Sequence, residues 1–217
     1  LLGMDMTLAK EGEKPQILIY HTHSQEAFAD SVPGDVNTGI VGVGEHLTQI
    51  LREQYGYAVL HHTGEYDVET RDNAYSKALP AVEQILTENP SIQVIVDLHR
   101  DEVAEGTRLV TDLQGRPTAR FMFFNGLSRT RKTGDIDYLQ NENQEANLAF
   151  SFQMQLKAAE YYPGLTRRIY LKGYRYNMHL RPRTLLVELG AQNNTVEEAM
   201  NACDPLAHIL DMVLKGE

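Results

Sequence analysis

Histidine and acidic side chains stand at the ends of apolar segments in this sequence. His21 and His23 directly follow one such segment, and His99 follows a second. Glu188 lies inside the end of a third. The chain has 8 histidines among 217 residues, so a random scatter would rarely give this placement. Imidazole and carboxylate groups together can bind a metal ion or move a proton.

The spacing of these side chains predicts a zinc site. Two neutral imidazoles and one carboxylate, with a fourth position open, are the usual ligands of a catalytic zinc ion. We expect His23 and His99 as the imidazole ligands. Glu26 is the expected carboxylate, because the His-x-x-Glu spacing places it beside His23 on a tight turn or a first helical turn. The alternatives are His21, as a ligand or as a partner of one, and Glu45 as the carboxylate.

A zinc-bound water also needs a general base, and Glu188 is the candidate. It is the one carboxylate in an otherwise apolar segment, LLVEL (185–189). Burial of a carboxylate there is costly unless the group has a role. The alternative interpretation is a structural ion pair, for example with Arg100.

Alternating strands and helices are needed to bring these side chains together. Short apolar segments predict strands, and apolar residues spaced three and four apart predict helices. The strands are expected at 16–20, 57–61, 92–98, 120–124 and 184–189, and the helices at 43–55, 78–86, 143–161 and 196–215. This order predicts an α/β fold, a three-layer sandwich with a mostly parallel central sheet. Such sheets bind ligands beyond the carboxyl ends of their strands, where the candidate residues lie.

Length, charge and cysteine content exclude several classes of protein. A chain of 217 residues is expected to form one domain, here 15–217, preceded by a polar tail at 1–14. The net charge of −10 argues against nonspecific binding of nucleic acid. One cysteine excludes an intrachain disulfide and a cysteine-rich zinc site. The sequence starts at Leu1 with no visible signal peptide, and we expect it to be a piece of a longer protein.

Several longer motifs resemble the stage II sporulation protein P family. They are ILIYHTHSQEAF (17–28), VDLHRD (96–101), YYPGLTR (161–167), Tyr176-Asn177 and LLVELGAQNNTVEEA (185–199). The likeness runs from about residue 15 to residue 214. That family is similar to the zinc N-acetylmuramoyl-L-alanine amidases, which cut the amide bond between muramic acid and the stem peptide of peptidoglycan. An endopeptidase activity on peptide cross-links has also been assigned to it, and the resemblance implies an amidase (phosphorylase/hydrolase-like) fold.

The resemblance also assigns roles to residues. It places the first metal-binding histidine at the His21/His23 pair and the second at His99, with Glu188 as the catalytic glutamate. In the wider amidase group the carboxylate ligand stands at the start of the first helix, which favours Glu45 and leaves the choice against the nearer Glu26 open.

Two further roles concern charge stabilisation and substrate binding. Arg100, or an asparagine after the catalytic glutamate (Asn193 or Asn194), is expected to stabilise the charge on a tetrahedral intermediate. Long glycan strands require an open cleft, and Tyr176 with Tyr174 is expected to line it. Ordinary loop packing is the alternative for both tyrosines.

The resemblance implies a cellular setting as well. It implies a Zn²⁺ cofactor, peptidoglycan as the substrate, and stage II sporulation proteins D and M as partners. It also implies that a transmembrane segment, N-terminal to this sequence, anchors the domain on the outer face of the membrane at the sporulation septum during engulfment.

Two other functions remain open from the residues alone. A zinc carboxypeptidase-like peptidase would use much the same ligands, but it needs a fixed arginine for the terminal carboxylate of its substrate. A noncatalytic cell-wall binding domain would hold no stoichiometric zinc and would not depend on Glu188.

Overall fold

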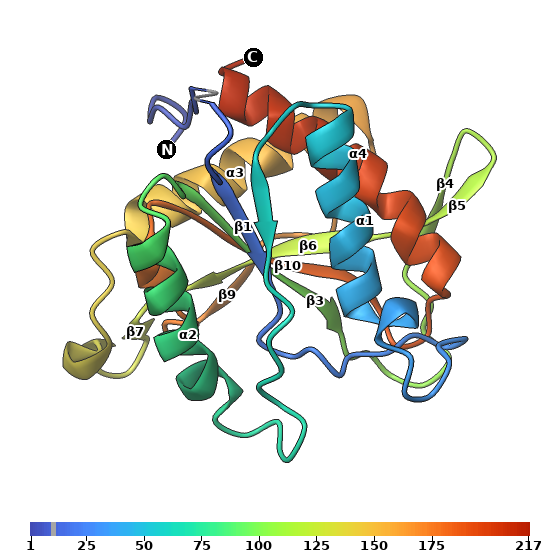
Figure 1. Cartoon of the computed structure of the whole chain (residues 1–217), viewed down its shortest axis with the longest axis horizontal. Helices are drawn as coiled ribbons and strands as arrows, with labels where there is room; N and C mark the ends of the chain where they lie inside the picture. Colours follow the sequence, from blue (N-terminus) through green and yellow to red (C-terminus); the bar gives the residue numbers. More distant parts are fainter. Residues whose placement is uncertain (10–11) are drawn as a thin grey trace.

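Six strands form the central sheet in the order β2-β1-β3-β10-β6-β9 (Figure 1). The computed structural model describes residues 1–9 and 12–217. The strands are β1 (Ile17–Tyr20), β2 (Val59–His61), β3 (Val94–Asp101), β6 (Phe121–Gly126), β9 (Tyr170–Lys172) and β10 (Arg183–Ala191). Neighbouring strands are parallel except β6 and β10, which are antiparallel. The predicted α/β fold with a mostly parallel sheet is confirmed.

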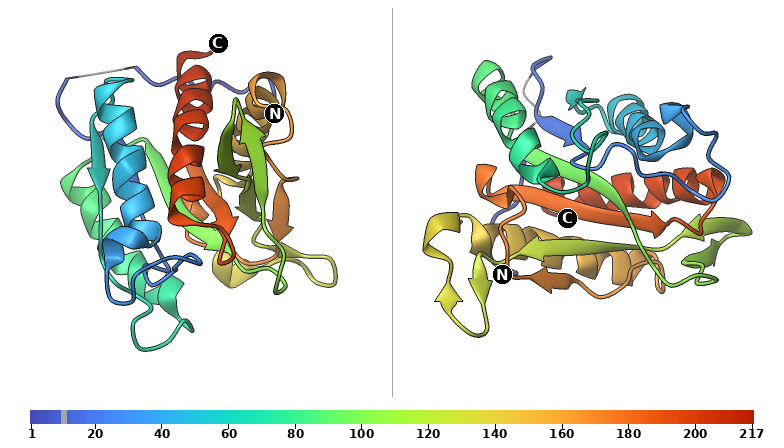
Figure 2. Two further views of the ribbon diagram at one scale, coloured as in Figure 1. Left: turned by 90° about the vertical axis from the view of Figure 1, so that its right-hand side faces the viewer. Right: turned by 90° about the horizontal axis from the view of Figure 1, so that it is seen from below.

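The helices cover the two faces of this sheet unequally. The main core packs beneath α1 (Ile40–Glu53), α3 (Gln144–Tyr161) and α4 (Val196–Lys215). A smaller core lies on the opposite face beneath α2 (Ala74–Glu88). Figure 2 shows α1 and α4 side by side, with α2 set apart from them. One face of the sheet is therefore thickly covered, and the other is covered by a single helix.

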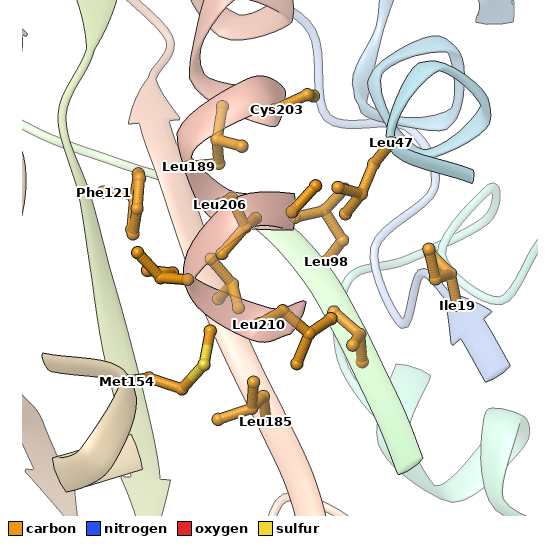
Figure 3. Close-up of a cluster of buried hydrophobic side chains, with 14 of the residues drawn as sticks. Ile19, Leu47, Leu98, Phe121, Met154, Leu185, Leu189, Cys203, Leu206 and Leu210 are labelled. Atoms are coloured by element: carbon orange, nitrogen blue, oxygen red, sulfur yellow. The ribbon is translucent and has the colours of Figure 1, made fainter. Parts of the chain in front are cut away.

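Strand alternation determines which side chains reach the thinly covered face. Val96 and Leu98 of β3 point into the main core, which Figure 3 shows in close-up with Leu98. Ile95 belongs to the smaller core beneath α2. Because successive side chains of a strand point to opposite faces, Asp97 and His99 share the face of Ile95. Polar groups can lie buried there because each has a charged or hydrogen-bonding partner.

The remaining elements are short and lie around the sheet. They are η1 (Val36–Thr38), η2 (Asp137–Leu139), η3 (Met178–Leu180) and two hairpins, β4 (Val110–Leu113) with β5 (Arg116–Ala119) and β7 (Arg129–Thr130) with β8 (Gly134–Asp135). Sequence patterning did not predict these hairpins or β9. Their strands are largely exposed, so they lack the apolar run or alternation that marks a buried strand.

Most boundaries shift from the prediction by a few residues, and two of the shifts bear on the site. The helix expected from residue 78 begins at Ala74 and contains Pro80. Asn73, with φ of 66°, starts it in the left-handed conformation that asparagine tolerates. The strand expected to end at residue 98 continues to Asp101, so His99 lies within β3 rather than after it.

The described part of the predicted tail packs against the domain. Met6 and Leu8 belong to the main core, and Leu8 N donates to Leu214 O at 2.8 Å. Residues 10 and 11 of that segment lie outside the described residues. Within the ranges 1–9 and 12–217, the model contains no helix with both the length and the apolar character needed to cross a membrane.

We predict that Gly42→Ala destabilises the domain. A Cβ on Gly42 would overlap the backbone oxygen of Asn37, which lies in η1 and cannot move as a flexible side chain could. The expected loss is about 2 kcal/mol of unfolding free energy, since overpacking outweighs the roughly 1 kcal/mol that alanine adds to a helix. Urea unfolding would measure it, with Gly3→Ala as the control because a Cβ there meets nothing within 4 Å. Equal stability of the two variants would contradict the packing argument.

Candidate active site

The turn after β1 carries His23, and a carboxylate from another loop holds it. Asp67, in the connection between β2 and α2, lies with Oδ2 3.5 Å from His23 Nδ1. Its Oδ1 accepts hydrogen bonds from Ser24 Oγ at 3.0 Å and from the Gln25 amide at 3.3 Å. Burial raises the pKa of Asp67, but the interaction with His23 and these two bonds outweigh burial and lower it, so an ionised carboxylate fixes the turn next to the imidazole.

Glu26 is buried at the end of the same turn, and both of its carboxylate oxygens have partners. Oε2 accepts from the Arg100 amide at 2.8 Å and lies 3.5 Å from His99 Nδ1. Oε1 accepts from Arg71 Nη2 at 2.6 Å. Burial alone would raise the pKa of this carboxyl, but the bond to His99 and its charge outweigh burial and lower the pKa to about 2. Glu26 is therefore a permanent buried anion.

His99 lies between two carboxylates. Its Nε2 is 2.7 Å from Asp97 Oδ1, and its Nδ1 faces Glu26. Asp97 also accepts from Thr22 N at 2.9 Å and from Thr22 Oγ1 at 2.7 Å. Burial opposes protonation of His99, but the charges of Asp97 and Glu26 prevail and raise its pKa well above the usual value. Without a bound cation, the imidazole carries a proton that balances these anions.

Aromatic rings border the two imidazoles. The rings of His23 and His99 meet edge to face with centroids 5.3 Å apart. Tyr75, in the first turn of α2, stacks on His99 at 6.3 Å and meets His23 edge to face at 5.7 Å. Tyr176 meets Tyr75 at 5.1 Å. The site is thus walled by tyrosines on the side of α2.

Glu188 is the Cα partner of His99 across the parallel strands β10 and β3. It shares the thinly covered face because its neighbours Val187 and Leu189 point into the main core. Burial raises its pKa to about 7, with the negative charges of Glu26, Asp101 and Asp97 adding to burial and His99 opposing it. A carboxyl with this pKa can both accept and release a proton near neutral pH.

Arg100 does not pair with Glu188 in the structure. Its guanidinium donates to the Ala27 carbonyl at 3.0 Å and to the Asp101 carbonyl at 3.3 Å. The cation nearer to the carboxylates is Arg71, which bonds Glu26 and whose positive charge is stabilised by Glu188. The ion-pair interpretation of Glu188 with Arg100 is therefore wrong.

The donors for a metal are close together, but they do not form a closed cluster. Within residues 1–9 and 12–217, no three His, Cys, Asp or Glu side chains are grouped so as to hold a metal ion. Yet His23 Nδ1 and His99 Nε2 are buried without a well-directed hydrogen bond, each beside a carboxylate. Carboxylates beside imidazoles are usual around metal ligands. Residue types and proximity fit zinc, and the side chains must tighten to bind it.

The alternative ligands His21 and Glu45 lie in a second cluster. His21 Nδ1 is 2.8 Å from the Leu98 carbonyl, and its Nε2 is 2.9 Å from His61 Nε2. His61 Nδ1 in turn is 2.9 Å from Glu45 Oε2. Glu26, not Glu45, is the carboxylate that reaches His99.

Asn193 and Asn194 use their amides within the protein. Asn193 Nδ2 donates to the Ala104 and Thr107 carbonyls at 3.2 and 2.8 Å. Asn194 is fully buried, and its Oδ1 accepts from the Ala191 amide at 2.9 Å. These bonds hold the connection from β10 to α4. A substrate contact by either asparagine stays a prediction.

Sequence reasoning missed three residues of this site: Asp67, Arg71 and Tyr75. All three follow the end of β2, the strand at the edge of the sheet. The available signal was their place after a parallel strand, where ligands bind. An irregular loop has no periodicity to show which of its side chains turn inward.

A family model matches most of this chain. Residues 5–211 match the family model described as Stage II sporulation protein P (SpoIIP). The chain is 26% identical over 219 residues to "Stage II sporulation protein P" of Bacillus subtilis (strain 168), covering 91% of this chain and 51% of that protein. It therefore spans about half the length of this curated relative.

Solved amidase structures share the fold. N-acetylmuramoyl-L-alanine amidase AmiC2 of Nostoc punctiforme matches with a TM-score of 0.52 at 12% identity, over 90% of this chain and 94% of that one. The amidase Ami1 from Mycobacterium smegmatis matches with a TM-score of 0.53 at 13% identity, over 95% and 100%. At these identities the likeness concerns the fold, and the predicted amidase-like architecture is confirmed.

We predict that Glu188→Gln stabilises the metal-free protein at alkaline pH. The pKa of Glu188 is about 7 when folded, above its ordinary value of 4.5. The folded state therefore holds the proton more tightly, and stability falls as pH rises from 4.5 through 7. Discounted for partial exposure, the expected gain of Glu188→Gln is about 2 kcal/mol at pH 8 and near zero at pH 4.5.

Urea unfolding in the presence of a chelator at the two pH values would measure this gain. The exposed Glu13→Gln variant is the control, and its difference from wild type should not change between the two pH values. A gain for Glu188→Gln that is the same at both pH values would contradict the assigned environment.

Proposed function

Because the chain belongs to the stage II sporulation protein P family, we propose that it is a zinc-dependent N-acetylmuramoyl-L-alanine amidase, which removes stem peptides from the glycan of peptidoglycan during sporulation. The observation that carries this proposal is that four side chains meet at the carboxyl ends of the parallel strands of an amidase-like sheet. They are the imidazoles of His23 and His99 and the carboxylates of Glu26 and Glu188.

The proposed ligands are His23, Glu26 and His99. A zinc ion held there would polarise the amide carbonyl and lower the pKa of a bound water to about 7. Asp67 and Asp97 would orient the two imidazoles, as each already lies beside a ring nitrogen. A zinc ion would also replace the proton that His99 carries in its absence, because metal ligands must be deprotonated.

Glu188 is the proposed proton carrier. With a pKa of about 7 in the metal-free protein, its carboxyl group would take a proton from water and return it to the departing amine. Arg100 is proposed to help stabilise negative charge on the substrate carbonyl oxygen. Arg71 is a second cation for this purpose, since its guanidinium is half-exposed and bonded to Glu26.

The setting and the partners are proposals of the same kind. We propose that a preceding membrane segment anchors the protein on the outer face of the septal membrane. The proposed partners are stage II sporulation proteins D and M. An endopeptidase activity on cross-links would use the same site, since both reactions hydrolyse an amide.

We predict that His99→Ala and Glu188→Gln separate metal binding from catalysis. His99→Ala removes a ligand, so bound zinc should fall from about one per chain to near zero, and activity should fall with it. Glu188→Gln keeps the ligands and should retain zinc while hydrolysis drops by about a factor of 10² to 10⁴. Elemental analysis and chromatography of cell-wall digests would measure both.

The digestion products decide between the functions considered. Stem peptides released from intact glycan support the amidase, whereas trimmed peptides with the muramoyl bond intact would indicate a peptidase. Full activity of Glu188→Gln would contradict the mechanism. A wild type with no bound zinc after zinc is supplied, and with no released product, would indicate a binding domain.

We predict that Glu26→Ala and Glu45→Ala differ in zinc content. Glu26 is buried against His99, so its loss should lower zinc affinity by at least tenfold. Glu45 is half-exposed and bonds His61, so its loss should leave most of the zinc bound. Competition with a zinc chelator would give both affinities, and a reversed order would move the carboxylate ligand to Glu45.

A further inference from the structure

A pocket opens beside the candidate active site, at the start of α2. Its volume is about 450 Å³. Asn73, Tyr75 and Ser76 line it from the beginning of α2, and the segment from Tyr174 to Asn177 lines it from the other side. None of the described residues that line it is acidic, although the chain carries a net charge of −10. The pocket is therefore a local exception to the charge of the domain.

Arg175 is the charged residue of this pocket, and it lacks a counter-ion. Its Nη1 donates to the Gln140 carbonyl at 3.2 Å. Its Nε is buried without a hydrogen-bond partner, and none of the described residues places a carboxylate within 4 Å of it. Burial lowers the pKa of Arg175, with Glu83 acting in the opposite direction. A half-buried guanidinium with unused donors favours an anion, and a carboxylate fits its fork of N–H groups.

The beginning of α2 also favours an anion in this pocket. Asn73 starts the helix without a side-chain hydrogen bond to its first turn, and that turn contains no acidic residue. The amino end of a helix carries a partial positive charge. Here that end and Arg175 face one pocket.

The wall that carries Arg175 is held in a strained conformation. Tyr176 has a φ of 51°, in the left-handed region that bulky side chains rarely adopt. Asn177 follows with a φ of 56°, a conformation that asparagine tolerates. Asn177 Nδ2 donates to the Tyr75 carbonyl at 2.9 Å and ties the wall to α2. Gly126 allows the wall to pack closely, because a Cβ there would collide with the Tyr174 and Arg175 carbonyls. Strain that the surroundings maintain in this way is typical of binding sites.

Two tyrosines connect the lining of the pocket with the candidate active site. Tyr75 lines the pocket and stacks on His99 at 6.3 Å, and Tyr176 lines it while touching Tyr75 at 5.1 Å. The negative charge of Glu188 acts on both tyrosines. A substrate whose amide lies at Glu188 would therefore extend one arm along these rings into the pocket.

We propose that this pocket binds a carboxylate on the peptide arm of the substrate, with Arg175 as the residue that pairs with it. The inference rests on the proposed function and extends it by naming which part of the substrate lies on the α2 side. Tyr75 and Tyr176 form the apolar wall along which the peptide lies, and Asn73 and Ser76 offer further polar groups at its end.

The test compares two ligands of nearly the same shape, one with carboxylates and the other with neutral amides in their place. One is N-acetylmuramoyl-L-alanyl-D-glutamate, and the other is the same compound with both peptide carboxyl groups converted to amides. Calorimetric binding to the zinc-loaded Glu188→Gln protein, which should not turn them over, gives the preference for the carboxylate form. We expect a preference of about tenfold, which Arg175→Gln in the Glu188→Gln background reduces to about twofold or less.

Two matched variants check this result. Arg131→Gln removes the same charge from an exposed turn and should keep the preference. Arg175→Lys keeps a positive charge without the planar fork and should keep part of it. Circular dichroism of each variant confirms that it is folded.

Each remaining outcome overturns the proposal in a distinguishable way. The Glu188→Gln protein that keeps Arg175 could bind both ligands equally while the wild type releases stem peptides. That result would contradict the carboxylate subsite and leave the proposed amidase function intact. A preference that Arg175→Gln does not change would place the carboxylate elsewhere. Binding of neither ligand, together with no hydrolysis by wild type, would overturn both the subsite and the proposed function.

Discussion

The position of His99 between Asp97 and Glu26 is the constraint on which the rest of the site depends. Each carboxylate also accepts a hydrogen bond from a backbone amide of the other segment. Asp97 of β3 accepts from Thr22 in the turn after β1, and Glu26 of that turn accepts from Arg100 of β3. The turn after β1 and the end of β3 are therefore joined through the same three ionisable groups. A buried charge cluster of this kind is stable only when every member has a partner. This requirement fixes the backbone positions as well as the side chains.

The unequal covering of the sheet makes such a cluster possible. Three helices bury the face on which Val187 and Leu189 lie, and this face supplies most of the apolar core. The opposite face has one helix and a smaller apolar core, so the polar side chains that alternate with the core residues are enclosed mainly by loops and by one another. The β2–α2 loop completes the enclosure with one anion and one cation, Asp67 and Arg71. The main apolar core and the cluster of ionisable side chains thereby lie on opposite faces of the same strands.

The sequence allowed the sheet and the strand-borne side chains to be predicted because both depend on local patterning. Glu188 could be identified because it interrupts an apolar strand, and His99 because it follows one. Asp67 and Arg71 could not, since loop residues take their orientation from tertiary contacts. Tyr75 lies in the first turn of α2, ahead of the helix start predicted at residue 78. His61 contacts His21 across two neighbouring parallel strands, with the Nε2 atoms of the two rings 2.9 Å apart. That contact depends on Gly44, whose missing side chain leaves room for both rings, and no single-residue pattern encodes it.

The packing of the first residues fixes where the N-terminus lies relative to the candidate site. Arg183, at the start of β10, bonds the Met6 carbonyl, whereas Glu188 lies five residues further along the same strand, about 17 Å away. Both chain ends lie on the side of the molecule away from the strand ends that carry the site (Figure 1). A tether joined ahead of residue 1 would leave the domain on the side opposite the strand ends that carry the site. Under the proposed anchoring, the domain would point its reactive edge away from the bilayer, and the length of the tether would set how deep into the wall it can cut.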